Sequence, residues 1–157
     1  MMADAGEVLE FTLGNEHYAL DITPVREIVE MTPITIIPRA PEHITGVINL
    51  RGEIVNIVNL NTFLKLPSQP ISKSQKIIVF MPDAVKGNNV GMIVDKVTSV
   101  TEISAAQVDC MMEGIAGNES KYIKGIINTG TEGGEKEGRG LIIWLDIQKM
   151  FKDIENT

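Results

Sequence analysis

Short runs of Val, Ile and Leu recur along the chain, and most of them stop at a Gly, Pro or Asn residue. Several runs alternate between apolar and polar positions, as in "VLEFTLG", which is typical of a strand with one buried face. The strands predicted in this way cover residues 8–14, 17–22, 25–30, 46–60 (two strands), 76–81, 90–103, 122–128 and 140–147. The pattern predicts a mainly β protein.

The helical signals are fewer. Residues 146–155 place Ile147, Met150, Phe151 and Ile154 at the spacing i, i+3, i+4 and i+7. This spacing predicts an amphipathic helix at the C-terminal end. Residues 61–66 are expected to be a helical turn or a strand end, and residues 104–120 are expected to be partly helical.

The remaining segments are interpreted as turns and connections. Gly14-Asn15 and Arg51-Gly52 interrupt strand patterns and are predicted to be hairpin turns. Residues 32–43 carry three prolines, which force an extended or turning path. Residues 67–75 are expected to be a linker, and the Gly- and Glu-rich residues 129–139 a flexible hairpin loop.

Parts of the first half return in the second half. "YALDITPVREIV" (18–29) aligns with "VGMIVDKVTSVT" (90–101) at an offset of 72 residues. "GVIN" (46–49) aligns with "GIIN" (125–128) at 79, and "VNLNTFLK" (58–65) with "LDIQKMFK" (145–152) at 87. Such a pattern can arise by chance among β-rich segments, but it favours two copies of a strand-rich unit, and so two small barrels sharing a core.

Composition narrows the class of protein. The net charge of the 157 residues is −7, and the sequence pI is about 4.8. This disfavours non-specific binding to nucleic acid or to anionic membranes, because both attract positive charge. No apolar run reaches the roughly 18 residues of a membrane-spanning helix, and the acidic N-terminus lacks the pattern of a secretory signal. With one cysteine, Cys110, there is no intramolecular disulfide framework. A cytoplasmic protein without membrane insertion is expected.

No residue pattern indicates catalysis, a metal or a cofactor. His17 and His43 lack metal-ligand spacing, and the acidic, apolar surroundings of Cys110 do not favour a reactive thiolate. The Gly-rich loop lacks the order of a phosphate-binding loop, and Glu135 and Glu137 are better explained as solvated charges. Aromatic residues make up only 4% of the chain, which argues against a barrel that binds single-stranded nucleic acid.

The function that remains is recognition of a partner at the surface, and Arg51 and Glu27 are the candidate residues for it. One interpretation is a structural ion pair between neighbouring strands, which stabilises the hairpin without a partner. The other is a groove in which Arg51 is the anchor and Val25 and Ile28 form the apolar floor. The residues alone leave both interpretations open.

Five stretches together resemble the CheW-like chemotaxis coupling proteins, in the order of that family and over residues 8–152. They are "FTLGNEHYALDITPVREIVE", "ITIIPRAPEHITGVINLRGEIVNIVNL", "VGMIVDKVTSV", "YIKGIIN" and "LIIWLDIQKMF". The resemblance implies a mainly β fold of two small SH3-like, five-stranded β-barrels that share a hydrophobic core, with a short C-terminal helix. We therefore expect one domain over 8–155, with barrels at about 8–75 and 76–152, after a disordered N-terminus (1–7).

The resemblance also implies a function. Such proteins are scaffolds that join the regulatory domain of the CheA histidine kinase to the cytoplasmic tips of methyl-accepting chemoreceptors at the inner face of the membrane. No catalysis and no cofactor are implied, and no nucleic acid is expected as a partner. The positions implied in receptor or kinase binding are Val25, Glu27, Ile28, Gly46, Arg51, Ile77, Ile78, Val97 and Val100, although several of the apolar ones can be core residues.

One section departs from the family pattern: Asn56 and Asn59 stand where the family usually has a proline and an aspartate. Asn59 can cap a helix nearly as well as aspartate, and Asp146 keeps the acidic residue in the second copy. Other interpretations of the chain remain. A coupling module of a different kinase pathway would have the same sequence features, a small-ligand barrel is less favoured, and an enzyme least.

Overall fold

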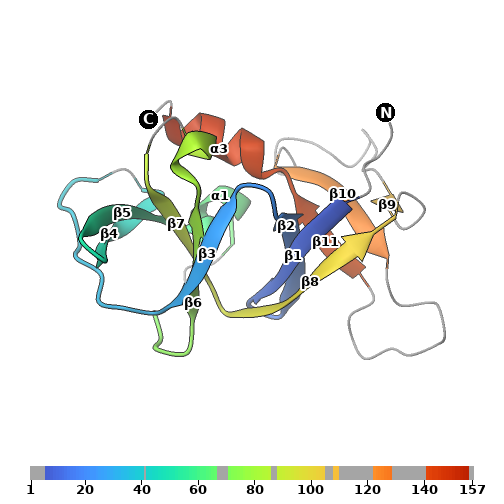
Figure 1. Ribbon diagram of the computed structural model, residues 1–157, viewed down its shortest axis with the longest axis horizontal. Helices are drawn as coiled ribbons and strands as arrows, with labels where there is room; N and C mark the ends of the chain where they lie inside the picture. Colours follow the sequence, from blue (N-terminus) through green and yellow to red (C-terminus); the bar gives the residue numbers. More distant parts are fainter. Residues whose placement is uncertain are drawn as a thin grey trace. The chain divides into compact units, whose positions relative to one another are not determined.

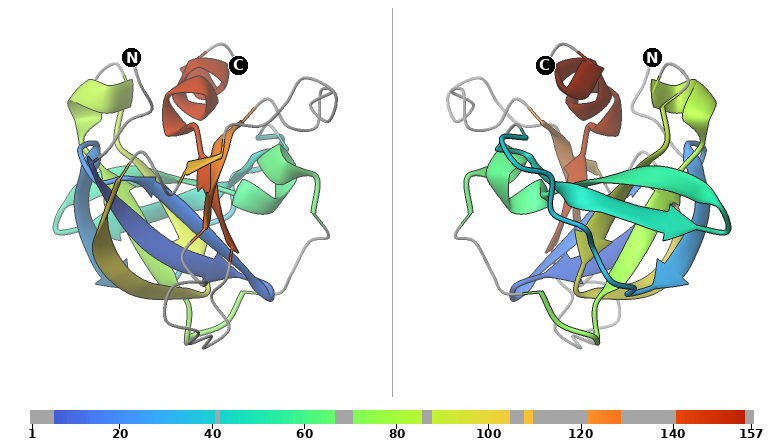
Figure 2. Two further views of the ribbon diagram at one scale, coloured as in Figure 1. Left: turned by 90° about the vertical axis from the view of Figure 1, so that its right-hand side faces the viewer. Right: turned by 90° about the vertical axis from the view of Figure 1, so that its left-hand side faces the viewer.

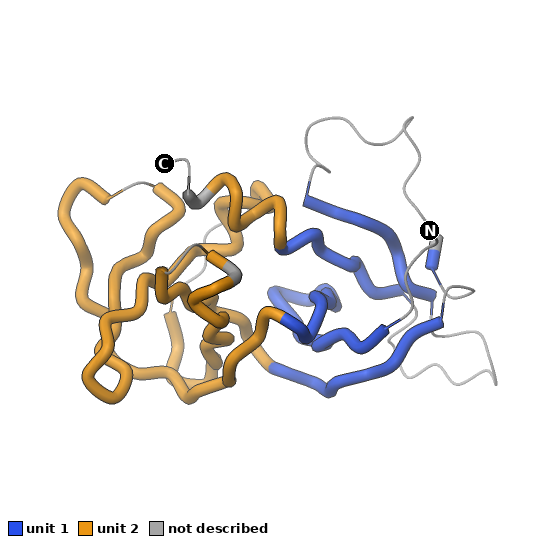
Figure 3. Tube along the Cα trace, turned by 45° about the horizontal axis from the view of Figure 1, so that its top comes forward, with its two compact units in different colours: residues 1–23, 97–147 blue, residues 24–96, 148–157 orange. Residues whose placement is uncertain are grey.

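The computed structural model describes residues 6–40, 42–66, 71–85, 88–104, 108–109, 122–128 and 141–155. The expectations for Cys110, for the loop at 129–139 and for most of 104–120 lie outside these residues. The predominance of strands confirms the mainly β prediction (Figure 1). The described chain forms two compact units, which Figure 3 distinguishes by colour.

The first unit, from residues 1–23 and 97–147, contains one six-stranded sheet. Its strands are β1 (Gly6–Leu13), β2 (Glu16–Asp21), β8 (Lys96–Ile103), β9 (Val108–Asp109), β10 (Ile123–Asn128) and β11 (Leu141–Leu145). The order across the sheet is β8-β1-β2-β11-β10-β9, in which the two-residue β9 is the additional strand. The predicted turn at Gly14-Asn15 joins β1 and β2, because Leu13 pairs with Glu16.

The second unit, from residues 24–96 and 148–157, contains a five-stranded sheet in the order β3-β6-β7-β5-β4. Its elements are β3 (Val25–Glu30), β4 (Ile44–Leu50), β5 (Glu53–Val58), α1 (Leu60–Leu64), β6 (Lys76–Phe80), the short 3-10 helix η1 (Pro82–Val85), β7 (Val90–Val94) and α3 (Ile147–Glu155). Figure 2 shows the extended segment 31–40 running alongside the β4–β5 hairpin. An antiparallel β-bridge between Thr35 and Val47 connects this segment to the hairpin. The predicted C-terminal helix is confirmed by α3.

The two units do not follow the halves expected at 8–75 and 76–152, because each takes strands from both halves. The stretch 90–103, expected as one continuous piece, divides at Asp95. Before Asp95, β7 pairs with β5 and β6, and after it β8 joins β1 in the other sheet. At the N-terminus, β1 begins at Gly6, so residues 6 and 7 belong to a strand and not to a disordered segment, whereas residues 1–5 lie outside the described chain.

Residues that the repeat aligns, at offsets of 72, 79 and 87, occupy equivalent positions in the two sheets. The order β3-β6-β7-β5-β4 in one corresponds to β8-β1-β2-β11-β10 in the other. Each sheet has a parallel pair between a strand of the first half of the chain and a strand of the second half: Ile57 pairs with Gly91 in one sheet, and Trp144 pairs with Ala19 in the other. Each sheet also has a register shift after the first residue of one strand, β4 or β10. The equivalent pairs after these shifts are Gly46 with Ile57 and Gly125 with Trp144. This agreement supports the duplication inferred from the sequence, with strands exchanged between the copies.

Each unit has an apolar cluster of its own. In the second unit the cluster consists of Ile48, Val55, Ile57, Ile77 and Val79. In the first unit it consists of Val8, Ala19, Ile103, Ile127, Ile142 and Trp144. The helix α3 adds Phe151, whose ring meets Phe80 edge-on at a centroid distance of 5.0 Å.

Candidate partner-binding site

The β4–β5 hairpin explains why an arginine follows so apolar a strand. Leu50 pairs with Glu53, so Arg51 and Gly52 form a two-residue turn. Both have positive φ angles, 50° and 89°, which is the geometry of the tight turns that match the twist of a hairpin. The Gly52 N–H donates to Asn49 Oδ1 at 2.9 Å and stabilises the turn. Arg51 is therefore at the exposed tip, and its side chain can extend away from the hairpin toward β3, the strand at the opposite edge of the sheet.

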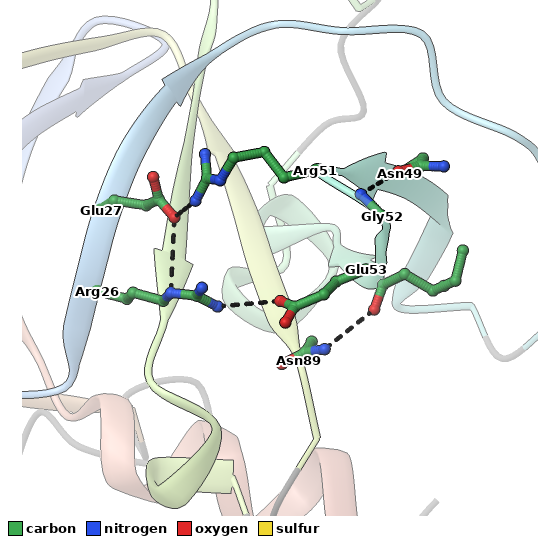
Figure 4. A network of polar contacts seen from close by, with 8 residues as sticks. Arg26, Glu27, Asn49, Arg51, Gly52, Glu53 and Asn89 are labelled. Atoms are coloured by element: carbon green, nitrogen blue, oxygen red, sulfur yellow. Dashed lines mark hydrogen bonds and ion pairs between the residues drawn. The ribbon is translucent and has the colours of Figure 1, made fainter.

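Arg51 reaches Glu27 on β3, and Figure 4 shows the two side chains pointing toward each other. The same Glu27 carboxylate lies 3.6 Å from Arg26 Nε, and Arg26 Nη1 lies 3.3 Å from Glu53 Oε1. The hydrogen bond to Glu27 is the main cause of a raised pKa of Arg51. We call Arg51, Glu27, Arg26 and Glu53 the Arg51 network. Positive and negative side chains alternate in this order of contacts.

The network lies on an edge strand. Within the five-stranded sheet β3 is the last strand on its side and pairs only with β6. Its side chains alternate between half-buried positions, including Val25 and Glu27, and exposed positions, including Arg26 and Ile28. Ile28 keeps 40% of its surface exposed. An edge strand with an exposed isoleucine beside a charged network combines apolar area with directional hydrogen bonds, as protein interfaces do.

The repeat shows that the network belongs to one copy. At the offset of 72 residues, Arg26 and Glu27 correspond to Thr98 and Ser99 on β8. Ser99 Oγ lies 3.2 Å from Thr101 Oγ1 in a neutral hydrogen bond. Because equivalent strands carry charge in one unit and hydroxyl groups in the other, the fold itself does not require the Arg51 network.

Three of the nine implied positions are core residues. Ile77 and Ile78 are 0% exposed, because β6 is a central strand between β3 and β7. Gly46 is buried, and a Cβ added there would lie 2.3 Å from the backbone oxygen of Thr35. Their burial favours the alternative that these positions are core residues: in this structure they serve packing and close backbone approach, and a contact with a partner stays a prediction.

Val97 and Val100 belong to the other unit. They lie on β8, which is an edge strand like β3, and Val100 is 51% exposed whereas Val97 is half-buried. They are the repeat equivalents of Val25 and Ile28. The described geometry thus brings together Val25, Glu27, Ile28 and Arg51, and it gives Val97 and Val100 the corresponding places on the second sheet.

Sequence reasoning missed Arg26, Glu53 and Asn49. The signal available for Asn49 was its position two residues before Arg51-Gly52, since Asn side chains commonly bond turn backbones. For Arg26 and Glu53 no local signal existed, because β3 and the β4–β5 hairpin are not adjacent in the strand order and only the folded sheet brings these two side chains together.

The two asparagines that depart from the family pattern both have hydrogen bonds. Asn59 Oδ1 accepts from the Asn61 N–H at 3.0 Å, which confirms that Asn59 caps α1. Asn56 Nδ2 donates to the Asn89 carbonyl oxygen at 3.3 Å. Both asparagines therefore contribute to the local structure, Asn56 within β5 and Asn59 at the start of α1.

No helix within the described residues has both the length and the hydropathy needed to cross a bilayer. Nor do they contain a group of three or more His, Cys, Asp or Glu side chains arranged to hold a metal ion.

Known proteins resemble this chain in both sequence and fold. The family model described as "CheW-like domain" matches residues 7–155. The chain is 34% identical to the chemotaxis protein CheW of Thermotoga maritima, over 94% of this chain and 89% of that protein, and 31% identical to that of Treponema pallidum, over 95% and 84%. The crystal structure of the scaffolding protein TtCheW from Thermoanaerobacter tengcongensis superposes with a TM-score of 0.71 at 30% identity, covering 90% of this chain and 89% of that one. The chain belongs to the CheW-like domain family.

Proposed function

We propose that this protein is a non-catalytic scaffold of chemotaxis signalling, which couples methyl-accepting chemoreceptors to the CheA histidine kinase. Its family membership and its likeness to chemotaxis proteins and to a scaffolding protein support this role. Within the chain, the observation that carries it is the exposed Arg51 network on an edge strand. In this proposal the protein works in the cytoplasm beneath the receptor arrays, and it needs no cofactor.

The proposed contact surface consists of Arg51, Glu27, Val25 and Ile28. Arg51 remains 60% exposed although it bonds Glu27, and a guanidinium has five N–H donors. It can therefore keep Glu27 and still donate to a partner, while Ile28 supplies apolar area that a partner helix would cover. Val97 and Val100 would offer a second apolar edge to a second partner on the other unit.

The test is a calorimetric titration of the purified chain with a receptor cytoplasmic fragment and, separately, with a CheA regulatory domain. Arg51→Ala is the test variant. Lys76→Ala is its control, because Lys76 Nζ forms a comparable surface ion pair with Glu30 at 3.2 Å in the same unit. We expect micromolar binding to both partners, weakened about tenfold or more for one of them by Arg51→Ala and unchanged by Lys76→Ala.

Two results would contradict the proposal. Binding to neither partner by a well-folded chain would mean that the family fold serves another pathway. If Arg51→Ala lowers the melting temperature and leaves binding per folded molecule intact, the network is a structural ion pair and not a contact site.

A further inference from the structure

The second unit contains a hollow that the Arg51 network does not use. It has a volume of about 590 Å³ and is bounded by residues 31–36, which follow β3, and by residues 71–73, which precede β6. Its lining includes Met31, Pro33, Ile34, Ile36, Ile71 and Lys73. We call it the 31–73 pocket. Its volume lies within the range of roughly 300–1,000 Å³ that is usual for binding pockets.

One wall of the pocket is fixed by the adjoining hairpin. The Thr35 N–H donates to the Val47 oxygen at 2.8 Å, and the Val47 N–H donates to the Thr35 oxygen at 2.9 Å. Met31 and Ile34 pack against the apolar cluster of the unit, and Pro33 has a restricted φ angle. This wall is therefore formed before any partner arrives.

The other wall is held by a buried glutamine. Gln75 is 7% exposed, and its Oε1 accepts from the Ser72 N–H at 2.8 Å. Its Nε2 donates to Asp95 Oδ1 at 3.0 Å. The turn that presents Ile71 and Lys73 is thus attached to the end of β7, and a partner would lose little free energy in ordering it.

Large apolar side chains gather at this pocket and remain uncovered. Ile36 is 64% exposed and Ile71 is 49% exposed, and the neighbouring Ile37 is 40% exposed. A single exposed isoleucine is ordinary on a protein surface. Two of them lining one hollow, with a third beside it, are typical of an interaction site.

The charged side chain among the residues that line the pocket is a cation, Lys73. Glu30, which precedes Met31, has its carboxylate 3.2 Å from Lys76 Nζ. The stretches 31–40 and 71–75 contain Arg39 and Lys73 and no Asp or Glu, in a protein of net charge −7. Neither cation forms an ion pair with a residue that the structure describes. A partner that is complementary to this surface must therefore carry carboxylates beside its apolar side chains.

We propose that the 31–73 pocket is a docking site for an acidic amphipathic peptide segment of a protein partner. Aliphatic or aromatic side chains of the segment would pack against Ile36 and Ile71, and a carboxylate would pair with Lys73. The site shares no residue with the Arg51 network. It therefore goes beyond the receptor–kinase coupling and does not depend on it.

The test begins with random peptides of about a dozen residues displayed on phage and selected on the full-length wild-type chain. We expect the enriched sequences to combine Asp or Glu with Leu, Ile, Phe or Trp. The best of them is then synthesised with a fluorescent label, and its binding is measured by anisotropy. A second peptide with Gln in place of each acidic residue measures the contribution of charge.

Three variants locate the binding. Ile36→Ser should weaken the acidic peptide about tenfold or more, and Lys73→Glu should weaken it while bringing the Gln peptide close to it in affinity. Leu141→Ser is the matched control, because Leu141 is 60% exposed but lies on β11 in the other unit. It should bind the acidic peptide as the wild type does.

The proposal is overturned if no enriched peptide loses affinity on Ile36→Ser, if the enriched peptides are basic, or if Leu141→Ser weakens binding equally. Circular dichroism checks that each variant is folded; if Ile36→Ser is not, Ile71→Ser takes its place. Receptor and kinase fragments play no part in this experiment, so its failure is separate from a failure of the coupling proposal.

Discussion

Gly46→Ala separates packing from partner contact at a position for which sequence and structure suggest different roles. The added Cβ would lie 2.3 Å from the Thr35 oxygen and 2.8 Å from Ile34 Cγ2. Carbon and oxygen atoms that are not bonded lie about 3.3 Å apart at their closest comfortable contact, so the backbone at Thr35 must move by roughly 1 Å. That backbone is held by its two hydrogen bonds to Val47, at 2.8 and 2.9 Å, and cannot move without weakening them.

The magnitude follows from these contacts. Overpacking of a buried site costs about 1–3 kcal/mol, and two weakened hydrogen bonds add about 1 kcal/mol each at most. The lower unfolded-state entropy of alanine returns about 0.4–1 kcal/mol. We expect the free energy of unfolding to fall by about 2–4 kcal/mol, and the melting temperature to fall by roughly 5–15 °C in a domain of this size.

The assay is urea unfolding at 25 °C followed by circular dichroism, with Gly91→Ala as the control. A Cβ at Gly91 meets Ile77 Cγ2 at 2.9 Å and Ile57 Cδ1 at 3.2 Å, which are side-chain ends that can shift. The equivalent position in the first unit is already an alanine, Ala19. Gly91→Ala should therefore cost less than Gly46→Ala. If Gly46→Ala is as stable as the wild type and yet binds partners poorly, the close approach is not the role of this glycine, and the contact role implied by the sequence is right.

Three further changes test other parts of the structure. Phe151→Ala removes a buried ring from α3 and should lower the free energy of unfolding by about 3–5 kcal/mol, as measured by urea titration. Burial lowers the pKa of the His43 imidazole in the folded chain, so the unfolded chain binds more protons than the folded chain as the pH falls below about 6.5. The free energy of unfolding of the wild type should therefore fall more than that of His43→Gln between pH 7.5 and 5.5. Equal losses in the two proteins would contradict this assignment. Asp21 accepts a hydrogen bond from the Trp144 indole N–H at 2.9 Å and contacts Lys124 Nζ at 3.3 Å, and Asp21→Ala removes both contacts. The buried N–H that is left without a hydrogen bond should lower the free energy of unfolding by about 1–3 kcal/mol. Unfolding curves followed by the fluorescence of this single tryptophan measure the loss.

Much of the local structure could be predicted from the sequence. The strand expected at 25–30 is β3 without a change of boundary, and the hairpin turns at 14–15 and 51–52 are where they were expected. The helix α3 begins one residue after its expected start. These features depend on the alternation of neighbouring side chains and on turn chemistry, which act over a few residues and are visible in the chain itself.

The candidate site was predicted only in part. An ion pair between Arg51 and Glu27 was one of the two interpretations that the residues left open, and the structure contains this contact. Ile28, expected in the floor of a groove, is 40% exposed. For Ile77 and Ile78 the sequence left a contact role and a core role open, because they are consecutive apolar residues of a strand buried on both faces. Such a run does not reveal which neighbours cover it, since that depends on the order of strands in the sheet.

The sequence by itself determined the strands, the turns, the C-terminal helix, the repeat and the family, because each rests on local periodicity or on motif order. Only the tertiary structure decided that the chain divides at Asp95, where one stretch leaves the five-stranded sheet and enters the other. It also decided that Arg26 and Glu53 complete the Arg51 network, and that residues 31–36 and 71–73 enclose a pocket. These contacts join residues far apart in sequence, and the free energy that selects them comes from burial across the whole sheet and not from any single segment.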